Sequence, residues 1–352
     1  MRRFAETPCA APCLSQLIRA LVVAFLLVGS FGYGQQLQCS VELIPGVDSI
    51  AAINSRGELA GVFFAGTGNH AFKFTHGQLI DLGTLGGPHS WAWDINDRGD
   101  VVGAAVASHF NWSLHAFLFS SSGMRDLGSL DPANPSAWSI AYGINGRGLI
   151  VGRGAIGNTA HAFLYEDGSF RDLGTLGGSY SGANAINDRG VIVGFSAVEG
   201  DLSYHAFKWE NGQLSDLGTL GGNFSSASAV NNSGTIVGTS TTETGEWHAF
   251  SYEHGKMSDL GSVPAGSVTA ESINQKGWAV GHAEFGPAYD QHTPFLFAAG
   301  KQFDLARCSP GLVLFFARDI NDSGHIAADG VREGEGASKA YVVRLLSRPH
   351  PD

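Results

Sequence analysis

The chain has 352 residues, including 49 glycines and 4 cysteines, and a formal net charge of −11. Residues 1–34 carry three arginines and one glutamate, so the remainder has a net charge near −13. Such an acidic chain repels nucleic acid and anionic membrane surfaces, and we expect neither as a partner. Glycine is about twice as frequent as its usual share of roughly 7%. The excess has no collagen-like period, which assigns it to turns.

Residues 1–34 have the pattern of an export signal. Arg2, Arg3 and Arg19 supply positive charge, residues 20–31 are nearly all apolar, and small residues follow. An apolar run of about a dozen residues suits a signal peptide and is short for a membrane span. The alternative is a retained signal anchor. We therefore expect residues 35–352 to form one domain, with no membrane insertion once the signal is removed. It would lie outside the cell, at the cell surface or in the periplasm.

Seven copies of one repeat fill residues from about 41 to 346. Each copy contains an Asn followed three residues later by Gly, as in Asn187-Asp188-Arg189-Gly190. Internal repeats of this length must be recognised first, because they decide the fold. The repeat asparagines are Asn54, Asn96, Asn145, Asn187, Asn231, Asn274 and Asn321.

Each copy divides into four short segments with the composition of strands. In the clearest copy they are Ala183–Ile186 (a), Val191–Gly194 (b), Ala160–Tyr165 (c) and Phe170–Gly174 (d). They are apolar or β-branched, and Gly, Asn, Asp and Ser bound them. Tight turns join a to b and c to d. Four strands in each of seven units predict an all-β, seven-bladed β-propeller of four-stranded blades. A sandwich or a β-solenoid is the alternative, although neither explains seven equal units as well.

The two ends of the repeat region complement each other. The last copy has its a, b and c segments but no d segment. Val41-Glu42-Leu43 matches the d segment Arg171-Asp172-Leu173. We expect this N-terminal strand to complete the last blade and close the ring, which removes the exposed sheet edges.

Five copies begin their c segment with His-Ala-Phe, and the sixth and seventh depart as Thr293-Pro294-Phe295 and Lys339-Ala340-Tyr341. On these residues the chain resembles the extracellular HAF-repeat family, named for that step, over roughly residues 41–346. The resemblance implies an extracellular, repeat-built protein and carries no established activity.

Each of those five histidines is followed eleven residues later by Asp. In an antiparallel c–d hairpin this spacing places both side chains on one face. We predict buried His–Asp hydrogen bonds with a structural role, because histidines in five different blades cannot converge on one ion. No metal and no cofactor is expected. The pairs are His70–Asp81, His115–Asp126, His161–Asp172, His205–Asp216 and His248–Asp259.

The connections differ in how strictly their lengths repeat. The a–b and c–d turns are constant, whereas the b–c loops vary and two d–a crossings carry insertions, at 131–138 and 308–314. In an antiparallel blade the b–c loops and d–a crossings share one face, here named the loop face; the other is the turn face. Length variation confined to one face is typical of a binding face.

Aromatic and acidic residues on the loop face, with variable channel-lining residues of the a strands, predict where a ligand binds. The opposing interpretation is ordinary surface polarity and relaxed packing at a wide channel. The candidate ligand-binding residues are Trp93, Trp112, Tyr142, Asn184, Tyr204, Trp247, Glu271 and Arg318.

These features favour a monomeric binding or scaffolding module for a carbohydrate or protein ligand, without catalysis. No nucleophile elbow, P-loop or zinc motif occurs. The alternative is a carbohydrate-active hydrolase or lyase. Its carboxylates at the channel mouth would be Glu271, Asp94 or Asp319, with Arg318 as their electrostatic partner.

Two cysteines, Cys39 and Cys308, lie outside the signal. The register places Cys39 just after a c–d turn and Cys308 in a d–a crossing on the opposite face. A strand of this length separates the faces by roughly 13–20 Å, whereas a disulfide needs Cα atoms within about 7 Å. We therefore predict no disulfide.

Overall fold

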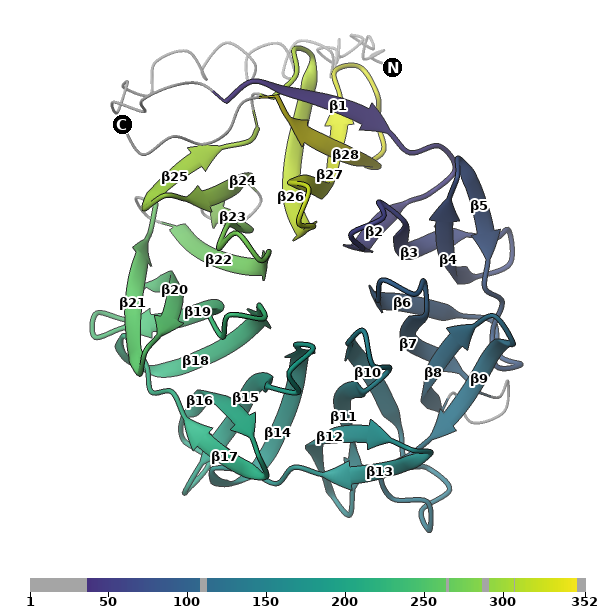
Figure 1. The fold of residues 1–352 in the computed structure, drawn as a ribbon, viewed down its shortest axis with the longest axis vertical. Coiled ribbons are helices and arrows are strands. Elements are labelled where there is room, and N and C mark those ends of the chain that lie inside the picture. Colours follow the sequence, from purple (N-terminus) through teal and green to yellow (C-terminus); the bar gives the residue numbers. More distant parts are fainter. Residues whose placement is uncertain (1–36, 108–112, 264–265, 287–290, 307, 347–352) are drawn as a thin grey trace, which may run out of the picture. The chain divides into compact units, whose positions relative to one another are not determined.

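The computed structural model describes residues 37–107, 113–263, 266–286, 291–306 and 308–346, and these residues form only strands, turns and loops. The predicted all-β class is confirmed. Residues 37–352 belong to one compact unit. Figure 1 shows four-strand groups arranged around a central opening, the arrangement of a β-propeller. Among the described residues, no helix has the length and apolar character needed to cross a membrane.

The a strands lie next to the opening and the b strands follow them outward (Figure 1). The a strands are β2 (Ser49–Ile53), β6 (Ser90–Ile95), β10 (Ser139–Ile144), β14 (Gly177–Ile186), β18 (Gly221–Val230), β22 (Gly266–Ile273) and β26 (Leu312–Ile320). The b strands are β3 (Leu59–Phe64), β7 (Val101–Val106), β11 (Ile150–Ile156), β15 (Ile192–Val198), β19 (Ile236–Thr242), β23 (Ala279–Phe285) and β27 (His325–Arg332).

The c strands come next and the d strands lie outermost (Figure 1). The c strands are β4 (Asn69–Thr75), β8 (Leu114–Ser120), β12 (Thr159–Glu166), β16 (Tyr204–Glu210), β20 (Trp247–Glu253), β24 (Gln291–Ala298) and β28 (Lys339–Leu345). The d strands are β5 (Gln78–Asp81), β9 (Gly123–Gly128), β13 (Ser169–Asp172), β17 (Gln213–Asp216), β21 (Lys256–Gly261), β25 (Lys301–Asp304) and β1 (Cys39–Leu43).

The sheet pattern corrects the prediction of seven separate blades. Four sheets are separate and four-stranded, and the other twelve strands form one continuous sheet. The reason is the length of β14 and β18, which have 10 residues each where β2 has 5. Their extra residues reach the preceding repeat and pair in parallel with its c strand, at Ala160↔Tyr180 and Tyr204↔Phe224. Each long strand begins at the first glycine of a Leu-Gly-Gly sequence, Gly177 in β14 and Gly221 in β18.

The predicted role of the N-terminal strand is confirmed. All five residues of β1 pair antiparallel with β28, from Cys39↔Leu345 to Leu43↔Tyr341. The last repeat therefore takes its outer strand from the start of the chain. Side chains of the last and first repeats also share a core, in which Ala327, Ala340 and Val342 pack with Ile50 and Phe72.

The core lies between neighbouring repeats, because each sheet buries both faces against the next. The aromatic of the His-Ala-Phe step is its anchor: Phe72 and Phe163 are among the fully buried side chains, as is Tyr341 in the last repeat. The b strand carries a glycine beside this aromatic ring for a steric reason. A Cβ at Gly61 would lie 2.2 Å from the Ser49 carbonyl oxygen and 2.9 Å from the Phe72 ring.

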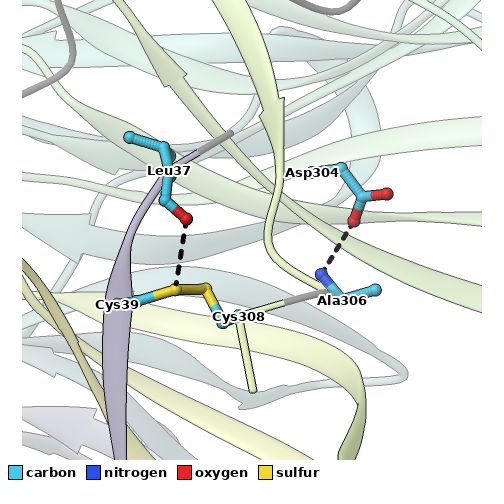
Figure 2. Close-up of a disulfide and its surroundings, with 5 residues drawn as sticks. All are labelled: Leu37, Cys39, Asp304, Ala306 and Cys308. Atoms are coloured by element: carbon cyan, nitrogen blue, oxygen red, sulfur yellow. Dashed lines mark hydrogen bonds between the residues drawn. A yellow bond between two sulfur atoms is a disulfide. The ribbon is translucent and has the colours of Figure 1, made fainter. Parts of the chain in front are cut away.

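The structure overturns the prediction that no disulfide forms. Cys39 and Cys308 are bonded, with Cα atoms 5.3 Å apart (Figure 2). The prediction assumed that the d–a crossing stays on the loop face. The segment 305–311 between β25 and β26 is long enough to bring Cys308 back towards the turn face, where Cys39 lies, at about 3.3 Å per extended residue. Both cysteines pack against the core between the sixth and seventh repeats, beside Val41 and Leu345.

Candidate functional site

The seven repeat asparagines form a closed ring of hydrogen bonds around the opening. Each side-chain Nδ2 donates to the backbone carbonyl of the next repeat's asparagine, and the last donor, Asn321, reaches Asn54 at 3.0 Å. Each Oδ1 accepts backbone amides of its own a–b turn, as Asn54 does from Arg56 and Glu58. These buried side chains are fully used in holding the turns together, which explains why the Asn recurs in every copy.

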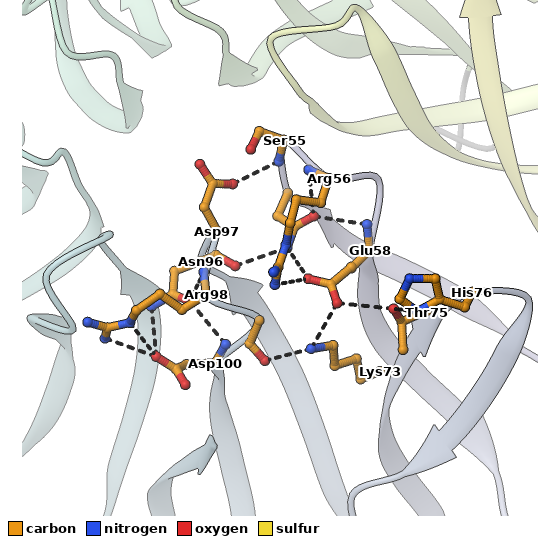
Figure 3. A network of polar contacts seen from close by, with 12 residues as sticks. Ser55, Arg56, Glu58, Lys73, Thr75, His76, Asn96, Asp97, Arg98 and Asp100 are labelled. Carbon is orange, nitrogen blue, oxygen red and sulfur yellow. Dashed lines mark hydrogen bonds and ion pairs between the residues drawn. The ribbon is translucent and has the colours of Figure 1, made fainter. Parts of the chain in front are cut away.

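A cavity of about 190 Å³ lies against this ring on the turn face. Its rim side chains accept backbone amides from the preceding repeat, as Asp97 Oδ1 does from Ser55 at 2.9 Å (Figure 3). Asp188 and Asp322 make the same contact with Gly146 and Gln275. Because these acceptors are engaged, the cavity is built mainly for structure. The described part of the chain contains no group of three or more His, Cys, Asp or Glu side chains placed to hold a metal ion.

Glu58 anchors a polar network beside the ring (Figure 3). Its Oε2 accepts from Asn54 at 2.6 Å and from Arg56, and its Oε1 contacts Lys73 and Thr75, both at 3.1 Å. Burial raises the pKa of Glu58, but the hydrogen bonds from Asn54, Lys73 and Arg56 outweigh it and lower the pKa to about 2. The carboxylate therefore stays ionised and stabilises the first repeat, to which all four of these partners belong.

From the channel wall to the loop face, aromatic rings form two groups of contacting rings, here together named the aromatic track. It begins on the channel wall, where Trp93 and Tyr142 lie 6.0 Å apart. It continues across the long strands β14 and β18 to the first residue of β20. Trp93 and Trp247, at its two ends, are 43% and 38% exposed. The track consists of Trp93, Tyr142, Tyr180, Phe195, Tyr204, Phe224 and Trp247.

Contacts between successive rings hold the outer part of the track in place. Tyr180 stacks on Phe195, with centroids 5.9 Å apart and planes at 29°. Tyr204 lies 6.3 Å from Phe195 and 6.3 Å from Phe224, and Phe224 lies 4.8 Å from Trp247. Tyr180, Phe195 and Tyr204 belong to the fourth repeat, and Phe224 and Trp247 belong to the fifth. The contact between Tyr204 and Phe224 joins the two repeats, so packing between repeats helps to fix the rings. A fixed row of partly exposed rings offers flat apolar surfaces for stacking.

Arg153 of β11 connects the two parts of the track. Its guanidinium lies 5.4 Å from the Tyr142 ring centroid and 5.9 Å from that of Trp138, which belongs to the inserted crossing 131–138. Its Nη1 donates to the Tyr180 hydroxyl at 2.8 Å. Burial raises the pKa of the Tyr142 hydroxyl, against a smaller opposite effect of Arg153, so the phenol is neutral at ordinary pH.

Two of the predicted carboxylates lie on a strands, Asp94 directly after Trp93 of the aromatic track and Asp319 in the last repeat. Asp94 accepts the Ile144 and Ile95 amides, and Asp319 accepts those of Ile53 and Ile320. Burial raises the pKa of Asp94 to about 7 and also raises that of Asp319, despite these hydrogen bonds. Both carboxylates bridge neighbouring a strands, which gives them a structural use.

Glu271 and Arg318 lie close to one histidine that sequence reasoning missed. Glu271 Oε1 is 3.5 Å from His282 Nδ1, and Glu284 Oε1 is 3.5 Å from its Nε2. Burial lowers the pKa of His282, and the opposing effect of the carboxylates is smaller, so the imidazole is neutral at ordinary pH. Arg318 stacks on Phe316 and pairs with Asp329 at 3.2 Å.

The five predicted His–Asp pairs are within hydrogen-bond distance. Each His Nδ1 lies 2.8 or 2.9 Å from the Asp carboxylate. They are not buried as predicted, because the Asp side chains are 34–45% exposed on the outer strands. Asp172 lies opposite Phe163, so His161 reaches it diagonally and the pair sits at the outer edge of its sheet. Each Asp also accepts a backbone amide two residues on, as Asp172 does from Gly174.

The structure brings some of the predicted ligand residues together and separates others. Trp93, Tyr142, Tyr204 and Trp247 belong to the aromatic track, whereas Glu271 and Arg318 lie in the sixth and seventh repeats. Asn184 donates to Ser226 and to the Ala227 carbonyl of the next repeat, so its amide is already bonded. Trp112 lies outside the described residues.

Sequence reasoning missed Arg153, Phe195 and His282, which occupy one repeat position. Each follows the b-strand glycine. The residue at this position differs in every copy, as do the channel-lining residues of the a strands. Comparing the copies there would have found them. The full set is Val62, Ala104, Arg153, Phe195, Thr239, His282 and Asp329.

No protein-family model matches the chain, and no curated protein matches it. Among solved structures it is similar to a puromycin hydrolase, with 12% identity over 87% of this chain and 54% of that one, at a TM-score of 0.54. A puromycin-hydrolyzing peptidase of Mycobacterium tuberculosis has 11% identity over 87% of this chain and 53% of that one, at 0.52. TolB of Acinetobacter baumannii has 11% identity over 68% and 61%, at 0.49.

This chain thus spans about half the length of the two puromycin-hydrolysing proteins and 61% of TolB. At such identities the likeness shows the fold alone. Fold and topology together define the class of the protein as a β-propeller.

Proposed function

We propose that this protein is an exported binding module, which holds a carbohydrate on the loop face along the aromatic track. The observation that carries the proposal is the set of rings from Trp93 to Trp247, which are partly exposed and held by contacts within and between repeats. Pyranose rings present apolar C–H faces, and rigid aromatic rings bind such faces at low entropic cost.

Two further features support an exported protein of this kind. A disulfide between Cys39 and Cys308 suits an oxidising compartment outside the cytosol. The arginines and apolar run of residues 1–34 fit an export signal. From its His-Ala-Phe steps we assign the chain to the HAF-repeat family.

A glycan array followed by isothermal titration calorimetry tests the binding proposal. We expect Trp247→Ala and Tyr204→Ala each to weaken binding about ten-fold, the loss of ~1.4 kcal/mol typical of an aromatic anchor. Phe64→Ala is the matched control, because Phe64 is 62% exposed near the same face but lies outside the track. An unchanged Kd in both track variants, or equal losses in the control, would contradict the proposal.

A second candidate, a carbohydrate-active hydrolase or lyase, is favoured by one observation. Glu271, which is 34% exposed, lies 3.5 Å from the neutral His282 imidazole, an arrangement suited to acid–base chemistry. The test is to incubate the bound glycan with the protein and analyse products by mass spectrometry. We expect no product; release by the wild type that Glu271→Gln abolishes would establish the enzyme instead.

A further inference from the structure

Arg153 carries a positive charge that no acidic group compensates. Among the described residues no carboxylate forms an ion pair with it, and its buried Nε has no hydrogen-bond acceptor. Its bonded partner at 2.8 Å is a hydroxyl, that of Tyr180, rather than a carboxylate. A half-buried charge without a counter-charge costs free energy. A bound anion would supply the missing counter-charge.

The surroundings fix the guanidinium in one orientation. The rings of Trp138 and Tyr142 lie within 6 Å of it, and Tyr180 holds Nη1. Arg presents its donors in a planar fork that matches a carboxylate bidentately, and stacking on aromatic rings keeps that fork pre-organised. The site therefore selects a planar anion beside an aromatic surface.

The site occurs once in the molecule. The equivalent position carries Val62, Ala104 and Thr239 in three other repeats and the anionic Asp329 in the last. The repeat architecture does not need a cation here, because its other copies fold with neutral or negative side chains. Arg153 thus has a use beyond packing.

Resting on the proposed carbohydrate binding, we infer that the ligand is an acidic glycan whose uronate carboxylate binds Arg153. The neighbouring sugar rings lie on the aromatic track, where Tyr142 contacts both Trp93 and Arg153, and Tyr180 is bonded to Arg153. An acidic peptide shares the carboxylate but lacks the pyranose faces that the row of rings fits.

The test compares a tetramer of galacturonate with its fully methyl-esterified form by calorimetry at low salt. Esterification removes the charge and leaves the sugar rings. We expect the wild type to bind the acid at least ten-fold more tightly, and Arg153→Met to bind both forms equally. Arg153→Lys should fall between them. Arg98→Met is the control, because Arg98 is paired with Asp100 on the turn face, and it should keep the preference.

The other possible results distinguish failure of the uronate assignment from failure of the proposed function. Equal binding of acid and ester by the wild type, or a preference that survives Arg153→Met, overturns the uronate assignment and leaves the carbohydrate proposal standing. If glycans on the array bind but the uronate tetramer does not, the uronate assignment is likewise wrong and the carbohydrate proposal stands. A glutamate pentapeptide that binds as tightly as the uronate would assign the site to acidic peptides. If neither tetramer nor any array glycan binds, the proposed function itself is wrong.

Discussion

At the scale of single residues, the buried carboxylates behave in two opposite ways. Glu58 has cationic and amide donors around it, and its pKa is lowered to about 2. Asp94 has only backbone amides to offset burial, and its pKa is raised to about 7. The difference is the presence of Arg56 and Lys73 beside Glu58. Glu58 stabilises its own repeat through charge, whereas Asp94 joins neighbouring repeats by accepting the Ile144 amide.

We expect Glu58→Gln to destabilise the protein by about 1–3 kcal/mol at pH 7, because the lowered pKa corresponds to roughly 1.4 kcal/mol per unit. The folded pKa lies below the ordinary value of 4.5. The stabilisation is therefore present above about pH 4.5 and is lost as the pH falls towards 2. Urea unfolding at several pH values measures it. Exposed Glu166 supplies the control Glu166→Gln; equal stability of Glu58→Gln and wild type at pH 7 would contradict the account.

Prediction of single-residue roles from sequence succeeded where the repeat gave a reference and failed where a partner lay in another repeat. The eleven-residue spacing found every His–Asp pair. The sequence predicts Asp94 and Asp319 as carboxylates at the channel mouth of the alternative enzyme. Their actual use, accepting the amides of Ile144 and Ile53, depends on an inter-repeat contact that no local pattern encodes.

At the scale of elements, strand order and the pairing of β1 with β28 followed from the sequence, because turn residues bound each strand and the missing d strand had one match. The merging of β10–β21 into a twelve-stranded sheet did not. The predicted a segment begins at Ala183, whereas β14 begins at Gly177, and β18 is extended in the same way. The disulfide was missed for a similar reason, since the path of residues 305–311 depends on packing between the sixth and seventh repeats.

The disulfide fastens the strand that closes the last repeat. We expect Cys39→Ser combined with Cys308→Ser to lower the free energy of unfolding by about 2–5 kcal/mol, because the bond spans 269 residues and restricts the unfolded chain. The fold should persist, since β1 keeps its pairing with β28. Urea unfolding of both proteins, with and without dithiothreitol, measures this. A wild type that is insensitive to the reductant would show that the bond contributes nothing.

At the scale of the whole molecule, several contacts meet where the last repeat joins the first. Asn321 completes the hydrogen-bonded ring at Asn54, and Asp329 accepts from Ser49 at 2.9 Å. Asp319 also accepts the Ile53 amide, and strand β1, which leads into the first repeat, pairs with β28 of the last. Closure turns a series of repeats into a rigid frame. That frame fixes the rings of the aromatic track.

The choice of the loop face as the binding face is the central claim. In the sequence, the claim depends on the variable lengths of the loops. In the structure, it depends on the contacting rings of the aromatic track. Sequence could indicate the face but could not find Arg153, Tyr180 or Phe224, because their importance comes from contacts across repeats. The turn face, with its cavity against the asparagine ring, is the competing location.

Hydrogen–deuterium exchange of the protein, free and saturated with its tightest array glycan, compares the two faces in one measurement. We expect slower exchange at the starts of β14 and β18 and in the b–c loops at 199–204 and 243–247. The a–b turns around Asn54 and its equivalents should not change. Protection confined to those turns, with the loop face unaffected, would contradict the account.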